Sequence, residues 1–194
     1  MFNFDDFILE NKYVKLEPLT EQHLPYLLPI ATQHPNLLQY SPSAFGTKVA
    51  LSAYIQTALL AKQQKTRYPF AIFDKTKQCY VGSTSFGNIS NKNLRTEIGW
   101  TWLAPKVHRT GTNRNVKFLM LQYAFEILKW ERIELKTDAR NQQSRKAIEG
   151  IGATYEGLLR SHTLMIDGYR RDTVYYSILR HEWPAIRASI FSKN

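Results

Sequence analysis

The stretch 108–113 combines a glycine with hydroxyl and basic side chains directly before a helical pattern. A helix N-terminus presents unpaired backbone N–H groups and a partial positive charge, and both favour a phosphate. Gly111 would let the backbone approach such a ligand closely. The residues of this candidate phosphate loop are His108, Arg109, Thr110, Gly111, Thr112, Asn113 and Arg114. An ordinary strand-to-helix turn with solvated arginines would have the same sequence pattern, so the loop alone leaves both interpretations open.

The elements around this loop are expected to hold it at the edge of a sheet. A strand over 94–103 precedes it and ends before Pro105, which cannot continue a central ladder. The helix over 113–129 has apolar residues three or four positions apart and a second apolar side, which predicts burial on most sides. A strand over 132–139 follows, and Asn141 is a good N-cap for a short helix after it.

The remaining elements complete a mixed chain. Strands are predicted over 13–18, 67–74, 79–88, 154–165 and 172–179, and helices after Thr20 and over 48–65. The order β-α-α-β-β-β-α-β-α-β-β predicts an α/β (α+β) fold with a largely antiparallel sheet and one buried central helix. No linker or repeat interrupts the sequence, so we expect one domain over residues 1–194.

Composition narrows the classes of function. The chain has 26 Lys and Arg against 16 Asp and Glu, a formal charge of +10, but the basic residues are scattered and nucleic acid is not expected as a partner. The single cysteine, Cys79, excludes an intrachain disulfide, and the five histidines lack metal-ligand spacing, so no metal is expected. No signal-peptide pattern and no run of eighteen apolar residues occur, which predicts a cytoplasmic protein outside the membrane.

The order of motifs resembles one known family, the GCN5-related N-acetyltransferases (GNAT), and within it the RimJ/RimL-like branch of ribosomal-protein N-terminal acetyltransferases. The resemblance is carried by the candidate phosphate loop, R-I-E-L-K-T-D-A at 132–139, N-Q-Q-S at 141–144 and G-I-G-A at 150–153. It implies a sheet splayed between two parallel strands, helices on both faces, and acetyl-CoA as co-substrate. The family loop reads Q/R-x-x-G-x-G/A, from which His108 and Asn113 depart.

The resemblance also implies roles for individual residues. Pantetheine would lie between the strands around 97–103 and 132–139, held by backbone groups near Trp102 and Leu103. Asn141 would contact the cofactor arm, and Ser144 would protonate the leaving thiolate, since the tyrosine of many members is replaced here by Ile148. Ser144 could instead only support the helix cap.

Glu97 is the candidate general base. Strict alternation would place Glu97, Gly99, Thr101 and Leu103 on one face of the strand and Ile98, Trp100 and Trp102 on the other. A carboxylate among apolar neighbours should have a raised pKa and could accept a proton. An exposed glutamate paired with Arg95 or a nearby lysine is the equally weighted alternative.

These observations predict an acetyl-CoA-dependent N-acetyltransferase acting on a primary amine, either a protein N-terminus or a small molecule. The substitution at His108 and the missing tyrosine keep an alternative open, a non-catalytic acyl-CoA-binding or interaction module of the same fold. A homodimer is possible.

Overall fold

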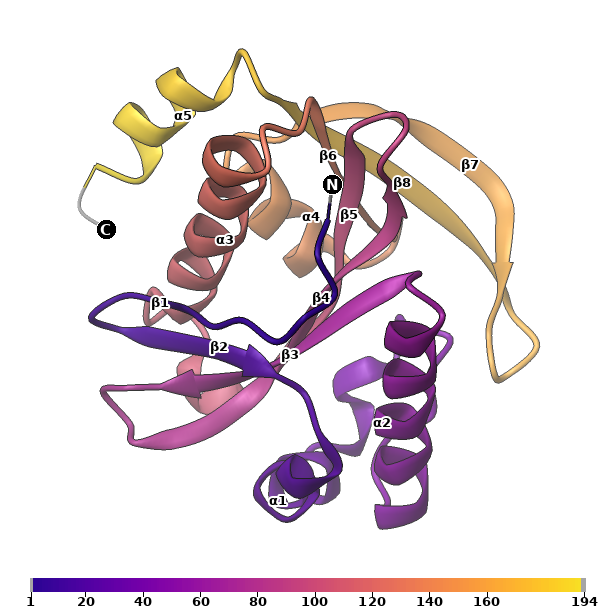
Figure 1. The fold of residues 1–194 in the computed structure, drawn as a ribbon. Coiled ribbons are helices and arrows are strands. Elements are labelled where there is room, and N and C mark those ends of the chain that lie inside the picture. Colours follow the sequence, from indigo (N-terminus) through magenta and orange to yellow (C-terminus); the bar gives the residue numbers. More distant parts are fainter. Residues whose placement is uncertain (1, 193–194) are drawn as a thin grey trace.

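The computed structural model describes residues 2–192, which build one eight-stranded sheet with helices on both faces (Figure 1). The strands lie in the order β1-β2-β3-β4-β5-β6-β8-β7, and every neighbouring pair is antiparallel except β5 and β6. Their bounds are β1 Leu9–Glu10, β2 Val14–Pro18, β3 Arg67–Asp74, β4 Cys79–Ser90, β5 Arg95–Leu103, β6 Arg132–Asp138, β7 Thr154–Leu164 and β8 Arg170–Leu179. The predicted mixed, largely antiparallel sheet is confirmed.

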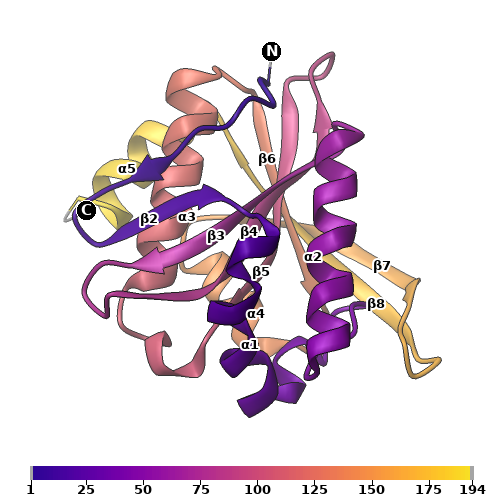
Figure 2. The same cartoon turned by 60° about the horizontal axis from the view of Figure 1, so that its bottom comes forward.

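The α-helices are α1 Leu24–Gln33, α2 Lys48–Gln63, α3 Thr112–Gln122, α4 Gln142–Glu149 and α5 Trp183–Ile190. Short 3-10 turns cover Glu21–His23, Pro35–Leu38 and Pro105–Val107, and α3 continues into a π-helical segment, Tyr123–Ile127. Two views of the ribbon place α1 and α2 on one face of the sheet and α3 and α5 on the other (Figures 1 and 2). Within residues 2–192 no helix combines the length and apolarity needed to cross a bilayer.

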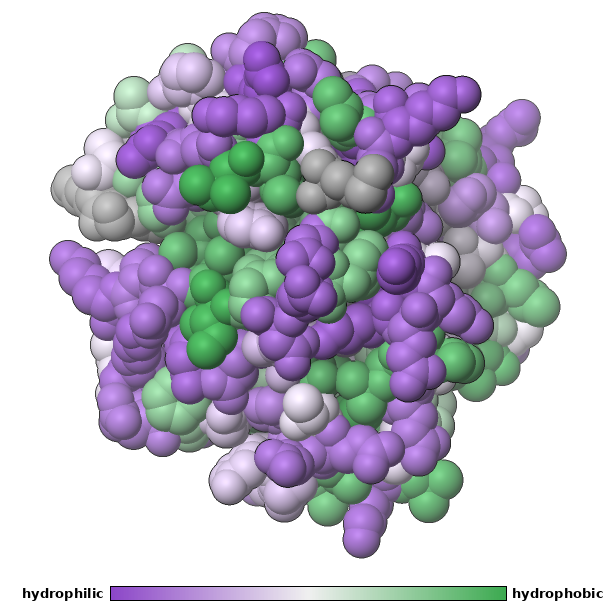
Figure 3. Space-filling view, viewed as in Figure 1, coloured by the Kyte–Doolittle hydropathy of each residue, from purple (hydrophilic) through white to green (hydrophobic). Residues whose placement is uncertain are grey.

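The core lies on both sides of β3 and of the middle of β4. All of β3 except Phe73 is buried, as are residues 81–87 of β4, because helices cover both faces there. The helix α3 fills one side with Val116, Met120 and Leu121, which confirms the buried central helix. The face of the molecule seen in Figure 3 is mainly hydrophilic, and hydrophilic side chains interrupt its apolar patches.

The two parallel strands separate soon after they meet. β5 and β6 pair only at Arg95 with Arg132, Thr96 with Ile133, and Glu97 with Glu134. Beyond these pairs, residues 98–103 of β5 and 135–138 of β6 do not pair with each other. Backbone N–H and C=O groups need partners, so this splay leaves one edge of each strand available to an extended ligand.

A β-bulge interrupts β5 at Trp100, whose φ of 51° is left-handed. Ser85 pairs with Gly99 but Ser83 pairs with Trp102, so one extra residue is inserted in β5. An extra residue reverses the alternation of side chains beyond it. The strict alternation predicted for 94–103 is therefore wrong beyond Gly99.

The reversal changes which residues share a face. Trp102 joins the face of Glu97, where its ring lies 6.3 Å from that of Tyr54 on α2. Thr101 turns to the opposite face and accepts a hydrogen bond from Lys117 of α3. Leu103 lies two residues after Thr101, so alternation places both side chains on the same face of β5.

Candidate active site

The loop before α3 has the geometry of an anion cradle. Gly111 is the N-cap of α3 and has a φ of 92°, a left-handed conformation that glycine adopts without strain. A Cβ built on Gly111 would meet only Asn115 Nδ2, at 3.9 Å, so the space in front of this backbone is open. A hollow of about 300 Å³ adjoins it, lined by Tyr13, Asp74, Thr76, Thr110, Gly111, Thr112, Arg114 and Asn115.

The two threonine hydroxyls of the candidate phosphate loop are engaged inside the protein. Thr110 Oγ1 donates to the carbonyl of Val107 at 2.8 Å, and Thr112 Oγ1 donates to Asp74 Oδ2 at 2.8 Å. Asn113, half-buried, sits in the first turn of α3, while the side chains of Arg109 and Arg114 are exposed. The groups that fit a pyrophosphate here are therefore the backbone N–H groups of the first turn and the two arginines.

His108 bridges the end of β5 and α4. Its Nε2 lies 3.0 Å from the carbonyl oxygen of Leu103, and its Nδ1 lies 3.4 Å from Gln143 Nε2. A carbonyl only accepts hydrogen bonds, so Nε2 donates to Leu103, while Nδ1 faces the side-chain amide of Gln143. The departure from the family loop thus provides a side chain that contacts one of the backbone groups expected to meet pantetheine.

α4 begins directly after β6, and Asn141 caps it. Asn141 Oδ1 accepts a hydrogen bond from the backbone N–H of Ser144 at 3.0 Å, as expected of an N-cap. Ser144 is half-buried, and its hydroxyl makes no hydrogen bond within residues 2–192. The cap geometry accounts for the Ser144 backbone and leaves its hydroxyl unassigned.

Glu97 is buried and ion-paired, which neither alternative from the sequence describes fully. The residue is only 4% exposed to solvent. Its Oε2 lies 2.9 Å from Lys136 Nζ and accepts from Asn88 Nδ2 at 2.6 Å, while Arg95 pairs with Glu134. A Cβ on Gly99 would lie 2.6 Å from Glu97 Oε1, so this glycine makes the room for the carboxylate.

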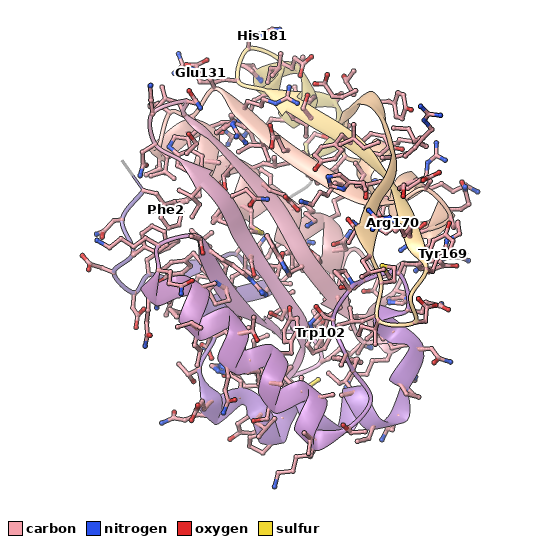
Figure 4. The ribbon with its side chains drawn as sticks, turned by 90° about the vertical axis from the view of Figure 1, so that its right-hand side faces the viewer. Phe2, Trp102, Glu131, Tyr169, Arg170 and His181 are labelled. Carbon is pink, nitrogen blue, oxygen red and sulfur yellow. The ribbon has the colours of Figure 1, made fainter. Side chains whose placement is uncertain are left out.

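A guanidinium and two indoles lie on the same face of the sheet as Glu97. Arg67 is buried, and it donates from Nε to Ser85 Oγ at 2.8 Å and from Nη2 to the Tyr54 hydroxyl at 3.0 Å. The Cζ atom of Arg67 lies 4.7 Å from the centre of the Trp100 ring. Trp102 is buried, and its Nε1 has no hydrogen-bond partner among the described residues. Figure 4 shows Trp102 at the end of β5, between α2 and the hairpin that carries Tyr169 and Arg170.

Sequence reasoning missed Arg67, Lys136 and Lys117. Each is a basic residue in or beside an apolar run, and its partner lies on another element, so no local pattern identifies it. Within residues 2–192, no three His, Cys, Asp or Glu side chains are grouped to hold a metal ion.

Comparison with known proteins points to one family. The family described as "Acetyltransferase (GNAT) domain" matches residues 14–154. YdaF of Bacillus subtilis (strain 168), named provisionally as a ribosomal N-acetyltransferase, is 34% identical over 102 residues. That match covers 53% of this chain and 55% of YdaF, so the chain spans little more than half the length of this curated relative.

Two solved structures share the fold over nearly the whole chain. A GCN5-related N-acetyltransferase from Brucella melitensis has a TM-score of 0.88 at 28% identity, covering 96% of this chain and 84% of its own. A structure from T. thermophilus, titled provisionally as an acetyltransferase, has a TM-score of 0.88 at 32% identity and covers 100% and 99%. The predicted fold is confirmed.

Proposed function

Because this chain belongs to the GNAT acetyltransferase domain family, we propose that it transfers an acetyl group from acetyl-CoA to a primary amine. The observation that carries the proposal is the splay of β5 from β6 beside a left-handed glycine at the start of α3. The open edges of the strands suit an extended arm, and the helix start suits the phosphates at its end.

Bound acetyl-CoA would supply an activated thioester carbonyl. The backbone of the first turn of α3, with Arg109 and Arg114, would bind the pyrophosphate. The unpaired backbone edge of 98–103, including Trp102 and Leu103, would hold the pantetheine arm with Asn141. These residues bind and orient, which by itself lowers the barrier because the reacting groups are held in position.

Two side chains are proposed for proton transfer. Glu97 would receive a proton from the acceptor amine, directly or through water, because its carboxylate lies on the face of β5 that the amine would approach, where Lys136 and Asn88 orient it. Ser144 would donate to the leaving thiolate, because its hydroxyl makes no hydrogen bond among the described residues. The non-catalytic alternative would leave the Ser144 hydroxyl, which makes no hydrogen bond among the described residues, without a use.

We propose a protein N-terminus as the acceptor, in the cytoplasm. Support comes from the ribosomal assignment in the name of YdaF, and from the charge of +10, which favours docking on an acidic partner such as a ribosome. The amine would approach between α2 and the β7–β8 hairpin, where Trp100 and Trp102 line the face of Glu97. A homodimer stays a prediction.

A panel of amines read by free-thiol release tests the function. Peptides with a free N-terminus, the same peptides with a blocked N-terminus, and small amines are mixed with acetyl-CoA. Thiol release that requires a free peptide N-terminus supports the proposal. Thiol release with small amines alone would show that the acceptor is a small molecule instead of a protein N-terminus. Acetyl-CoA binding without release from any amine would identify the non-catalytic module instead.

A further inference from the structure

Lys117 of α3 is a buried lysine with one polar partner. The residue is 6% exposed, and its Nζ donates to Thr101 Oγ1 at 2.8 Å. Within the described part of the chain it forms no ion pair with a carboxylate. A buried ammonium with a single hydroxyl partner lowers the stability of a fold. Its presence therefore calls for a reason other than packing.

The place of this ammonium supplies that reason. Thr101 directly follows the bulge at Trp100, in the part of β5 that has left β6. Lys117 therefore lies under the splay on the side of α3, while Glu97 occupies the opposite face of β5. The thioester of the proposed reaction would lie between them.

The hydroxyl that accepts from Lys117 is joined to further uncharged groups. Thr101 Oγ1 lies 2.7 Å from Thr84 Oγ1 on β4, which also contacts Met120 Sδ on α3 at 3.6 Å. Burial lowers the pKa of Lys117 to about 7, and the negative charge of Glu97 opposes this shift. Its charge therefore changes within the range in which the enzyme would work.

We propose that Lys117 is a positioning residue that fixes the bulged segment of β5 through Thr101 and places a positive charge beside the reacting thioester. The inference rests on the proposed function. In that reaction the amine nitrogen bonds to the acetyl carbon, and the C–S bond breaks with its electron pair passing to sulfur. The surplus amine proton passes to Glu97 or water. A nearby cation in a dry site stabilises the negative charge that develops on oxygen and sulfur.

This role has a signature that a structural role would lack. Lys117→Met removes a buried charge and keeps most of the length of the side chain, so the melting temperature should rise by about 3 °C or more. The same change should lower kcat at least about tenfold, with the KM for acetyl-CoA within about threefold. Lys92→Met, at an exposed turn, removes a lysine charge elsewhere and should change neither quantity. Thr101→Val removes the hydroxyl that accepts from Lys117 and should lose part of kcat.

The pH profile gives a second readout. The acceptor amine gains reactivity as pH rises, whereas Lys117 loses its charge above its midpoint near 7. The profile of wild-type kcat should therefore bend downward on the alkaline side, and Lys117→Met should remove that bend. A carbon-13 NMR titration of the lysines, assigned with Lys117→Met, should show one midpoint near 7 that moves upward when coenzyme A is added.

Each outcome decides the inference. An unchanged kcat, or a lower melting temperature for Lys117→Met, would overturn it, because the lysine would then be dispensable or structural. A titration midpoint of Lys117 that does not change when coenzyme A is added would also overturn the inference. Wild-type protein that releases no thiol with any amine refutes the proposed function instead, and the melting and NMR measurements still report on Lys117.

Discussion

Thr112 donates a hydrogen bond of 2.8 Å from Oγ1 to Asp74 Oδ2, and thereby joins the first residue of α3 to the last residue of β3. The other carboxylate oxygen, Oδ1, accepts from Thr76 and Lys77 in the β3–β4 turn. Burial raises the pKa of Asp74, but these hydrogen bonds outweigh burial and hold the pKa below its usual range. A carboxylate next to a phosphate loop would repel an anion, and here both of its oxygens accept hydrogen bonds that fix the loop and the turn.

Thr112→Val should therefore weaken the cofactor site without changing the chemistry. The loss of one buried hydrogen bond costs about 1–2 kcal/mol of unfolding free energy. Freed from Asp74, the first turn of α3 should bind acetyl-CoA several-fold less tightly, while kcat at saturation stays near wild type. Thr66→Val removes an exposed hydroxyl-to-carbonyl bond at the end of α2, away from the loop, and controls for the threonine-to-valine change itself. Equal affinities in calorimetry for both variants would show that the bond is irrelevant to binding.

Gly111→Val should abolish acetyl-CoA binding and only modestly lower stability. Valine is strained at a φ of 92°, and its branches would fill the open space before the backbone. Gly168→Val has the matched strain, at a φ of 81° with nothing within 4 Å, but sits in the β7–β8 turn. Thermal shift with millimolar acetyl-CoA should be lost in the first variant and kept in the second. A normal shift in Gly111→Val would reduce the loop to an ordinary turn.

Ser144→Ala separates binding from proton transfer. The N-cap bond uses the backbone of Ser144, so the substitution should leave α4 and the acetyl-CoA affinity intact. Loss of a proton donor lowers kcat by up to ~10²-fold, and by less here because a thiolate is a fair leaving group. Steady-state kinetics across a pH series measures the effect. An unchanged kcat at every pH would assign Ser144 to the cap alone.

Glu17→Gln tests an electrostatic cluster away from the site. Burial opposes ionisation of Glu17, but hydrogen bonds from Lys15, Tyr80 and His23 lower its pKa to about 2. A folded-state pKa below the unfolded value near 4.5 stabilises the fold above pH 4.5, and this contribution disappears as pH falls toward 2. Glu17→Gln should thus melt lower than wild type at pH 6, and the difference should shrink steadily below pH 4.5. A constant difference would show that the charge of Glu17 is not involved.

The course of the chain could largely be predicted from its sequence because its elements carry clear local periodicity. The strands over 67–74 and 132–139 were predicted to within a residue, and the last two strands lie within two residues of their expected bounds. The short strand Leu9–Glu10 was missed, since two residues give no pattern. The helix expected over 113–129 turns π-helical from Tyr123, a change that the apolar stripe does not encode.

Some residues of the candidate site could be predicted from neighbouring sequence, whereas others depend on contacts between distant elements. Gly111 and Asn141 could be predicted because turns and caps depend on residues adjacent in sequence. The pairing of Glu97 with Lys136 depends on two strands brought together only by the fold. The burial of Lys117 could not be predicted, because a lysine within an amphipathic helix is normally assigned to the solvent-facing side of that helix.

The bulge at Trp100 decides which side chains at the end of β5 face α2 and which face α3. If β5 kept Trp100 but ran without the bulge, strict alternation would turn Trp102 toward α3 and Thr101 toward α2. Lys117 would then lose its hydroxyl partner and face an indole. Deleting Trp100 would instead remove only the extra residue and keep Trp102 opposite Ser83, so a strand one residue shorter should keep both sides as they are.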